Sequence, residues 1–388
     1  MYRTIRLKEG KEASIHRRHQ WIFSGAIDFI DKKIQNGDVV EVVDSKNQFL
    51  AIGYYYNSSI SIKILTFNKE TIDHVFWKEK IKRAFFYRYK SLNLPNASNN
   101  AFRLINAEGD GIPGLIVDIY DDLAVVQCYN DFILNNIEKI VAALKNLPIE
   151  IKHIYNKSKN TLRNSVDGFI EGKCNNDKVI LENGLGFEID FMEGQKTGFF
   201  LDQRENRKFV EQLSQKRKVL NLFSYTGAFS VYALSGQADE VVSVDISQTA
   251  IDLARKNVEI NFGKTPKAKF VISDVFEYLQ NEENRYDLII LDPPAFAKTM
   301  DKQDIALQTY RKLNEAAMRL LEKNGILLTF SCSQVVPRDR FKQATFVAAA
   351  NIKRNCRILK NLYQYADHPI DLYHQESEYL KGFAIYFD

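Results

Sequence analysis

Three side chains in the second half of the chain could do chemistry: the carboxylates of Asp245 and Asp292 and the thiol of Cys332. Each ends or follows a run of apolar residues that is typical of a buried strand. Because parallel strands end at one edge of a sheet, we expect the three side chains to gather there. A thiol and an acid beside a bound cofactor would suit covalent catalysis.

A turn with a single glycine, Gly227, indicates the kind of cofactor. The residues from Val219 to Leu234 predict a strand, a turn and a helix, and Asp245 ends the next strand. An acid about 20 residues beyond such a turn binds the ribose hydroxyls of a nucleoside, although an isolated acid there can also simply cap a helix. A dinucleotide would require three glycines, so S-adenosylmethionine, which has no phosphate, fits better. The residues expected around this cofactor are Asn221, Phe223, Ser224, Tyr225, Thr226, Gly227, Asp245, Ile246, Asp274, Val275 and Asp292.

Two of these acids have further interpretations. Asp274 follows a strand and is placed either to accept a hydrogen bond from the adenine amino group or to cap a helix. Asp292 opens an Asp-Pro-Pro run in which two prolines hold the backbone extended after a buried strand. Such rigidity suits a planar substrate, and a plain strand-ending turn is the alternative. The residues expected to contact the substrate here are Pro293, Pro294, Phe296 and Lys298.

Cys332 lies between two serines where an apolar run ends. A lone cysteine is usually a buried and inert small residue. Here a helix is expected to follow, and its N-terminus would favour the thiolate, so Cys332 is the candidate nucleophile. No Cys-x-x-Cys pair occurs, so we expect free thiols and no metal. The other cysteines are Cys128, Cys174 and Cys356.

The residues from Gly194 to Arg207 precede the first strand of the expected sheet. Asp202 and Glu205 have the spacing of a capping box that opens a helix from Gln203 to Leu213. The residues before Asp202 are expected to cover the cofactor and meet its methionine carboxylate, with an ordinary surface loop as the alternative. They are Gln195, Lys196, Thr197 and Phe200.

The composition is that of an ordinary globular protein. The chain has 388 residues, 45% of them apolar, and a formal net charge of +4. This length suits two or three domains with packed cores, and the charge permits a polyanionic partner without requiring one. The chain has neither an apolar run of about 18 residues nor a signal-peptide core, so we expect a cytoplasmic protein with no membrane partner.

The spacing of apolar residues predicts three domains. Residues 1–72 contain short strand-like runs typical of a small β barrel. Residues 73–190 mix strands and helices, as in a small α+β domain, and residues 191–388 alternate them, as in a doubly wound Rossmann-like α/β sheet. One helix is basic, and phosphate contact and ordinary solvation both stay open for it. The expected helices run from Val75 to Tyr89 (the basic one), from Gln248 to Phe262 between the caps Ser247 and Gly263, from Gln303 to Glu322 before Gly325, and from Val335 to Asn355.

Together these motifs resemble those of the bacterial large-subunit ribosomal RNA cytosine-5 methyltransferases, class I enzymes with an N-terminal PUA domain. The resemblance covers nearly the whole chain. It implies a PUA domain, a central substrate-binding domain, and a mostly parallel seven-stranded methyltransferase sheet whose last strand is antiparallel. The motifs that carry it are Gln195 to Arg204, Asn221 to Gly227, Asp245, Leu291 to Phe296, Ser331 to Ser333, the PUA opening His19 to Gly25, and the C-terminal signatures Asp367 to Pro369 and Glu378 to Gly382.

The resemblance also implies S-adenosylmethionine as cofactor and large-subunit ribosomal RNA as partner. Arg17 and Arg18, directly before the PUA opening, are then expected to contact RNA. Whether the chain forms a homodimer stays open.

The implied chemistry agrees with the residues. Carbon 5 of cytosine is a weak nucleophile, so a thiolate, here Cys332, first adds to carbon 6. Asp292 would hydrogen bond or protonate the base near N3. The target base must leave its stack, and Phe296 would then pack on it. Many RNA cytosine-5 methyltransferases have a second cysteine where this chain has Ala295, so release of the product must proceed otherwise.

Three other functions stay in view. A methyltransferase acting on guanine would need no thiolate, and Cys332 disfavours it. A non-catalytic ribosome-assembly factor would be expected to have lost Asp245, Asp292 or Cys332. A nicotinamide dehydrogenase is disfavoured by the lone Gly227.

Overall fold

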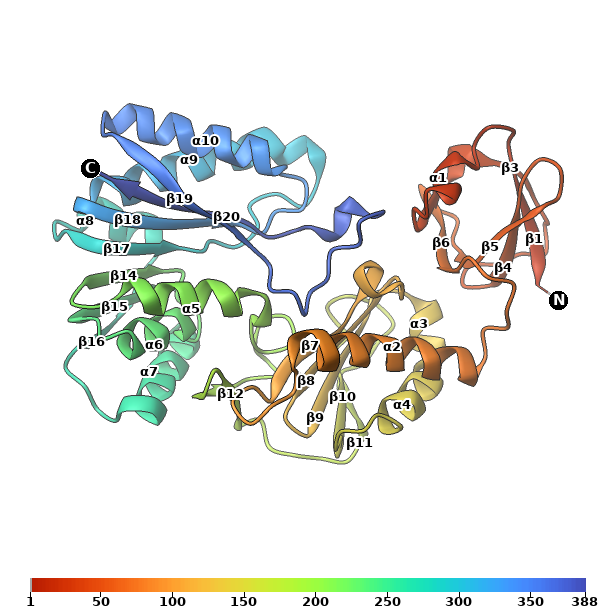
Figure 1. The fold of residues 1–388 in the computed structure, drawn as a ribbon, viewed down its shortest axis with the longest axis horizontal. Helices are drawn as coiled ribbons and strands as arrows, with labels where there is room; N and C mark the ends of the chain where they lie inside the picture. The colour runs from red at the N-terminus through yellow and green to blue at the C-terminus, as the bar shows by residue number, and fades with distance from the viewer. Residues whose placement is uncertain (1) are drawn as a thin grey trace. The chain divides into compact units, whose positions relative to one another are not determined.

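The computed structural model describes residues 2–388, which form two compact units (Figure 1). The first unit comprises residues 2–176, 190–199 and 366–377, and the second comprises residues 177–189, 200–365 and 378–388. Among residues 2–388, no helix combines the length and the apolar character that crossing a bilayer requires. The domain boundaries expected at residues 72 and 190 stay predictions. Residues 177–189 group with the second unit, and residues 366–377 return to the first unit.

The N-terminal part of the first unit is a six-stranded sheet in the order β2-β6-β5-β4-β1-β3. Every pair in it is antiparallel except β1 with β4. Side chains alternate along the strands, so that Ile5, Leu7, Val40 and Val42 all enter one apolar core. The elements are β1 Arg3–Leu7, α1 Ala13–His16, β2 Trp21–Phe23, η1 Ser24–Ala26, β3 Ile27–Ile30, β4 Val39–Val43, β5 Phe49–Tyr55 and β6 Ile60–Thr66.

The rest of the first unit is a five-stranded sheet in the order β11-β10-β9-β8-β7 with three helices. Its longest helix, α2 His74–Leu92, begins at Asp73, whose carboxylate accepts hydrogen bonds from the amides of Val75 and Phe76. Strands β8 and β9 are buried along their whole length. The other elements are β7 Ala101–Asn106, η2 Ala107–Asp110, β8 Leu115–Tyr120, β9 Leu123–Cys128, α3 Asp131–Asn135, α4 Ile137–Lys145, β10 His153–Asn156 and β11 Gly168–Glu171.

The second unit contains a seven-stranded sheet in the order β16-β15-β14-β17-β18-β20-β19, and a hairpin of β12 and β13. The first five strands are parallel, and β20 and β19 are antiparallel to their neighbours. The predicted Rossmann-like class, with an antiparallel last strand, is therefore confirmed. The strands are β12 Lys178–Glu182, β13 Leu185–Ile189, β14 Lys218–Leu222, β15 Glu240–Asp245, β16 Ala268–Ile272, β17 Tyr286–Leu291, β18 Leu321–Ser331, β19 Cys356–Tyr363 and β20 Lys381–Phe387.

Helices cover both faces of this sheet (Figure 1). Along β14, Val219 packs with α5 and α6 in one core, and Leu220 packs with α8, α9 and α10 in the other. Strands buried on both faces lack polar alternation, which explains their continuous apolar runs. The helical elements are η3 Leu201–Gln203, α5 Arg204–Leu213, α6 Ala228–Ser235, α7 Gln248–Phe262, α8 Val275–Asn281, η4 Met300–Lys302, α9 Gln303–Arg319, α10 Arg338–Ile352 and, in the first unit, η5 Gln375–Ser377.

A buried ion cluster fixes the hairpin to α5. The carboxylate of Glu182 is fully buried and accepts hydrogen bonds from Arg204 (3.1 Å) and Arg207 (2.7 Å). Burial alone would raise the pKa of Glu182, but the two guanidinium groups hold it below its ordinary value. The hydroxyl of Tyr232 on α6 also donates to Glu182, at 3.0 Å.

The expected helix α7 is confirmed, including the Ser247 cap, whose hydroxyl accepts from the amide of Ala250. Two other helices have different ends. The helix expected to reach Glu322 ends at Arg319, because Leu321 already pairs with Tyr286 of β17. The helix expected from Val335 begins at Arg338, because Pro337 disfavours helical backbone in the residue before it.

The predicted capping box at Asp202 is wrong. Helix α5 begins after the η3 turn, and its N-cap residue, Gln203, makes no side-chain cap. The carboxylate of Asp202 instead accepts a hydrogen bond of 2.6 Å from the Tyr379 hydroxyl, so a distant partner has replaced the local one.

Candidate active site

Four parallel strands of the second unit end at one edge of the sheet. Leu222 of β14 pairs with Val244 of β15 and with Leu291 of β17, which in turn pairs with Thr329 of β18. The residues that end or follow these strands therefore share this edge. Asp245, Asp292 and Cys332 are among them.

The carboxylate of Asp245 is held by backbone amides from both sides. Tyr225 N donates to Oδ2 at 2.8 Å, and Ser247 N donates to Oδ1 at 2.9 Å. Phe223, Tyr225 and Gly227 all have positive φ, at 57°, 46° and 74°. Glycine adopts such a φ without strain, but Phe223 and Tyr225 do not, and such strain collects where a loop must take one shape to meet a ligand. Asp245 thus fixes the turn and keeps a carboxylate at the sheet edge.

Two buried polar atoms near this turn fit a nucleoside ligand. Among the described residues, Asn221 Oδ1 and Ser224 Oγ have no hydrogen-bond partner. An unsatisfied buried polar group costs about 1–3 kcal/mol, which donors on a bound ligand would recover. The amide of Asn221 is oriented by its other atom, because Nδ2 donates to Ser230 at 2.9 Å. Thr226 is buried, and its carbonyl accepts from Asn257 Nδ2 at 3.0 Å.

The other expected cofactor residues of this unit have different environments. Ile246 is 69% exposed, and Val275 is buried in the core. Asp274 caps α8 by accepting from the amides of Phe276 and Glu277. The structure thus gives Asp274 the helix-cap role, and contact with adenine stays a prediction. The ring of Phe200 meets Tyr225 edge-on, with centroids 5.4 Å apart.

Asp292 has an unusual carboxyl group. Burial raises its pKa to about 7, and the nearby charge of Asp202 adds to the rise, while Gln203 and Arg207 oppose it. Gln203 Nε2 donates to Asp292 Oδ2 at 2.9 Å. A carboxyl group that titrates near neutrality can both donate and accept a proton, as acid–base chemistry requires.

The thiol of Cys332 lies beside the Asp-Pro-Pro run. Its Sγ is partly buried and donates to the carbonyl oxygen of Pro293 at 3.8 Å. Helix α10, expected from Val335, begins only at Arg338, farther from Cys332. A buried cation is present instead: Lys381, paired with Ser331 across β18 and β20, donates from Nζ to the carbonyl of Ser333 at 2.9 Å.

Sequence reasoning missed Lys381. Its side chain is only 3% exposed. Burial lowers its pKa to about 8, and the negative charge of the Cys332 thiolate acts to raise it. The signal that could have found it is its place in the C-terminal signature, next to Gly382. That segment returns to the sheet as β20 and so brings Lys381 to the edge.

The predicted substrate residues around Asp292 differ in exposure. Pro293 is buried, whereas Pro294 and Lys298 are exposed. Phe296 packs on Tyr310, with ring centroids 4.9 Å apart, and is partly exposed. Phe296 therefore belongs partly to the core, and its contact with a substrate base stays a prediction.

Comparison with known proteins identifies the family. The model of the S-adenosylmethionine-dependent methyltransferases matches residues 136–368, more than half of the chain. This chain belongs to that family. A second model, of the PUA-like domain, matches residues 5–67.

Curated relatives of this methyltransferase span nearly its whole length. A protein of Alteromonas mediterranea named ribosomal RNA large subunit methyltransferase I is 37% identical and covers 97% of this chain and 96% of its own. Its namesake in Aeromonas salmonicida is 38% identical, with 98% of both chains covered.

Solved structures of methyltransferases have a fold similar to that of this chain. One from Streptococcus mutans, described as a SAM-dependent methyltransferase, has a TM-score of 0.86 at 25% identity. It covers 99% of this chain and all of its own. Another, with a TM-score of 0.87 at 25% identity and the same coverage, is a methyltransferase complexed with SAH. The cofactor of the methyltransferase is thus S-adenosylmethionine, as predicted.

Three of the residues expected over the cofactor belong to the first unit of the methyltransferase. Thr197 is buried there, and its hydroxyl donates to Asp118 at 2.6 Å. The carbonyl of Lys196 accepts from Gln127, and the carbonyl of Gln195 accepts from Gly198. These bonds fix the segment to the five-stranded sheet, and its role over the cofactor stays a prediction.

The basic residues expected to contact RNA also differ in their exposure. Arg17 and Arg18 are exposed, and the guanidinium of Arg18 lies 4.9 Å from the ring centre of Phe67. On α2, Lys78 and Lys82 are exposed. Arg88 is fully buried and pairs with Asp110, so it does not serve as the phosphate contact considered for this helix.

Proposed function

We propose that this methyltransferase forms 5-methylcytosine in large-subunit ribosomal RNA, with Cys332 as the covalent nucleophile. Full-length relatives with 37–38% identity named for the large subunit support the RNA class. A PUA-like domain over residues 5–67 supports RNA binding. Such a substrate also implies a cytoplasmic location. The observation that carries the finer assignment is the partly exposed Cys332 thiol beside the Asp-Pro-Pro run.

The reaction requires a nucleophile that the cofactor cannot supply. S-adenosylmethionine, when bound, provides the methyl group. Carbon 5 of cytosine does not attack it unaided, so the Cys332 thiolate adds to carbon 6 and moves electron density to carbon 5. After methylation, a base or solvent water takes the carbon 5 proton, the electrons of that C–H bond re-form the 5,6 double bond, and the Cys332 thiolate leaves carbon 6.

Asp292 balances the charge that this addition creates. With its pKa raised to about 7, a large part of the population is protonated at neutral pH and can donate to the base near N3. An ordinary aspartate would be ionised and would repel the electron-rich ring. Gln203, which donates to the same carboxyl group, fixes its orientation.

Lys381 assists Cys332 as a positioning residue. Its buried ammonium group stabilises the thiolate over the thiol, a role we had expected from a helix N-terminus. Because its own pKa is about 8, this assistance weakens as the pH rises past that value.

The test is transfer of labelled methyl from S-adenosylmethionine to unmodified large-subunit ribosomal RNA, followed by digestion to nucleosides. We expect label in 5-methylcytidine with the wild type, and a loss of at least about 100-fold with Cys332→Ala, in line with removal of a nucleophile. Cys356→Ala, which removes an exposed cysteine, is the matched control and should retain activity.

Three outcomes would reject the proposal. Label in a guanosine derivative would show that the enzyme modifies another base without a thiolate. Undiminished 5-methylcytidine with Cys332→Ala would show that Cys332 is structural. If no label enters RNA while the protein still binds S-adenosylmethionine in calorimetry, the substrate class itself is wrong.

A further inference from the structure

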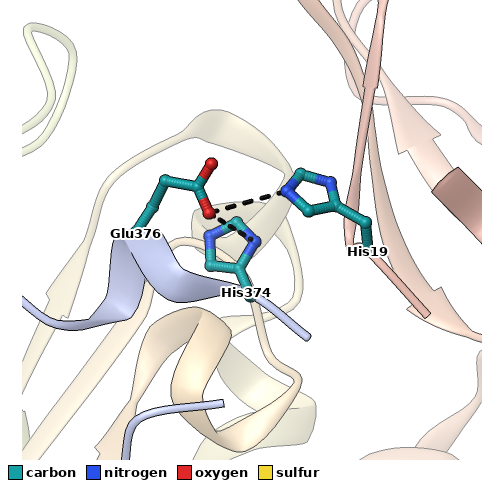
Figure 2. A group of neighbouring side chains, drawn as sticks. All are labelled: His19, His374 and Glu376. Carbon is teal, nitrogen blue, oxygen red and sulfur yellow. Dashed lines mark ion pairs between the residues drawn. The ribbon is translucent and has the colours of Figure 1, made fainter. Parts of the chain in front are cut away.

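Three side chains of the first unit lie close together: His19, His374 and Glu376 (Figure 2). Their ligand atoms all lie within 4.8 Å of one another. His19 Nε2 is 3.5 Å from Glu376 Oε2, and His374 Nδ1 is 3.7 Å from the same oxygen. Figure 2 shows both rings turned toward this carboxylate.

These separations suit a small cation. Zinc bonds to imidazole nitrogen and carboxylate oxygen at about 2.0–2.2 Å in tetrahedral sites, so neighbouring ligand atoms lie about 3.3 Å apart. The two distances to Glu376 Oε2 exceed that value by a few tenths of an ångström. All three ligand atoms lie within 4.8 Å of one another, so rotations of the two imidazole rings as well as of Glu376 would be needed to close the site around an ion.

His374 provides a second, independent observation that points to a ligand. Its side chain is 1% exposed, and Nδ1 has no hydrogen-bond partner among residues 2–388. A buried ring nitrogen without a partner costs about 1–3 kcal/mol. A neutral imidazole can bind a metal through the lone pair of such a nitrogen.

The ring of His19 is oriented by a hydrogen bond to the backbone, as the rings of metal-bound histidines usually are. His19 Nδ1 lies 3.2 Å from both the amide and the carbonyl of Trp21. In the tautomer that donates to the carbonyl, Nε2 is left to bind the metal, and the ring is held by its outer hydrogen bond. The Trp21 ring also packs edge-on against His374, with centroids 4.4 Å apart, and limits its rotation.

The charges around the site favour a cation. Besides Glu376, the carboxylates of Glu108 and Asp371 act on His374. Lys63 offsets part of the charge on Glu108, at 3.5 Å, and Gln20 donates to Asp371. A divalent ion here would face more negative than positive charge.

We propose that His19, His374 and Glu376 bind a zinc ion, with a fourth position open to water. Glu376 is 44% exposed, which leaves a route from solvent. The ion would fasten the PUA opening to the returning segment 366–377, a structural role independent of methyl transfer. The sequence indicates no metal because its cysteines are not closely spaced, whereas these ligands come from opposite ends of the chain.

Hydrogen bonds also hold the returning segment 366–377 to the first unit. The Asp367 carboxylate accepts from Arg103 N at 3.0 Å, and its carbonyl accepts from Arg88 at 2.6 Å. These bonds hold the start of the segment in place without a metal. Loss of one ligand should therefore reduce zinc affinity without unfolding the unit.

The test is a competition titration of the full chain with Zn²⁺ against a chromophoric chelator. We expect one zinc per chain, and affinity at least about tenfold lower for Glu376→Gln and His374→Gln. His74→Gln, which changes an exposed histidine outside the cluster, is the control and should bind as the wild type does. If His374→Gln misfolds, Glu376→Gln and His19→Gln decide.

Cobalt separates this site from the cysteines. Co²⁺ bound to nitrogen and oxygen ligands should show visible d–d bands without the near-ultraviolet thiolate charge-transfer band. Zinc should also raise the thermal midpoint of the wild type, but not of Glu376→Gln. Equal zinc affinity in Glu376→Gln and wild type, a thiolate band, or no binding would each overturn the proposal and leave only a histidine–glutamate ion pair.

Discussion

At the scale of single residues, the electrostatic interaction between Lys381 and Cys332 predicts how the reactivity of the thiol depends on pH. Replacing Lys381 by Met removes the buried ammonium group, so the Cys332 thiolate loses its stabilising charge and the thiol should ionise at higher pH. The alkylation rate of Cys332 by iodoacetamide, followed peptide by peptide across pH 6–10, should therefore move to higher pH.

Lys381→Arg is the matched variant for this measurement. It retains a cation opposite Ser331 and should keep the wild-type profile more closely than Lys381→Met does. A merely structural role for Lys381, through its bond to the Ser333 carbonyl, would alter rates without moving the profile along the pH axis. An unmoved profile in Lys381→Met would therefore remove Lys381 from the mechanism.

At the scale of elements, the turn after β14 depends on close contact with α7. A Cβ at Gly227 would lie 2.7 Å from the Cβ of Ala254, and Gly227 has a φ of 74°. Gly227→Ala should thus combine backbone strain with overpacking and destabilise the protein by about 2–4 kcal/mol. It should also weaken S-adenosylmethionine binding, because the strained turn would shift away from Asp245.

Gly263, directly after the C-terminal end of α7, provides the control. Its φ is 65°, but an added Cβ would meet nothing within 4 Å. Gly263→Ala should therefore report strain alone and leave cofactor affinity unchanged. Denaturant unfolding and calorimetric titration of both variants check this, and equal affinities in the two variants would contradict the packing argument.

The elements also explain how far the sequence alone could lead. Helix α7 was predictable because its apolar period and its Ser247 cap are both local. The end of α9 was not, because it depends on Leu321 pairing with Tyr286 across the sheet. The Asp202 capping box failed for the same reason, since its partner Tyr379 is 177 residues away.

Candidate site residues likewise divide into those set by local sequence and those set by distant partners. Asp245 and Asp292 could be placed because each ends or directly follows a recognisable strand. Lys381 and His374 could not, because each acquires its neighbours only when the C-terminal segment returns to the fold. Their altered pKa values come from burial, which no local pattern of residues reveals.

At the scale of the whole molecule, the chain joins a PUA-like module to a catalytic sheet, and we expect the module to contribute affinity for RNA rather than catalysis. Arg17 and Arg18 are exposed beside its opening. If each neutralises one phosphate, the double variant Arg17→Gln/Arg18→Gln should weaken binding to large-subunit ribosomal RNA and reduce the slope of log affinity against log salt by about 1.4, at about 0.7 per contact. Lys46→Gln, an exposed charge in the β4–β5 loop of the same sheet, is the control. Filter binding at several salt concentrations measures the affinity, and turnover at saturating RNA measures catalysis. An unchanged slope would show that these arginines do not contact phosphate. A loss of turnover at saturating RNA would show that the module also positions the base.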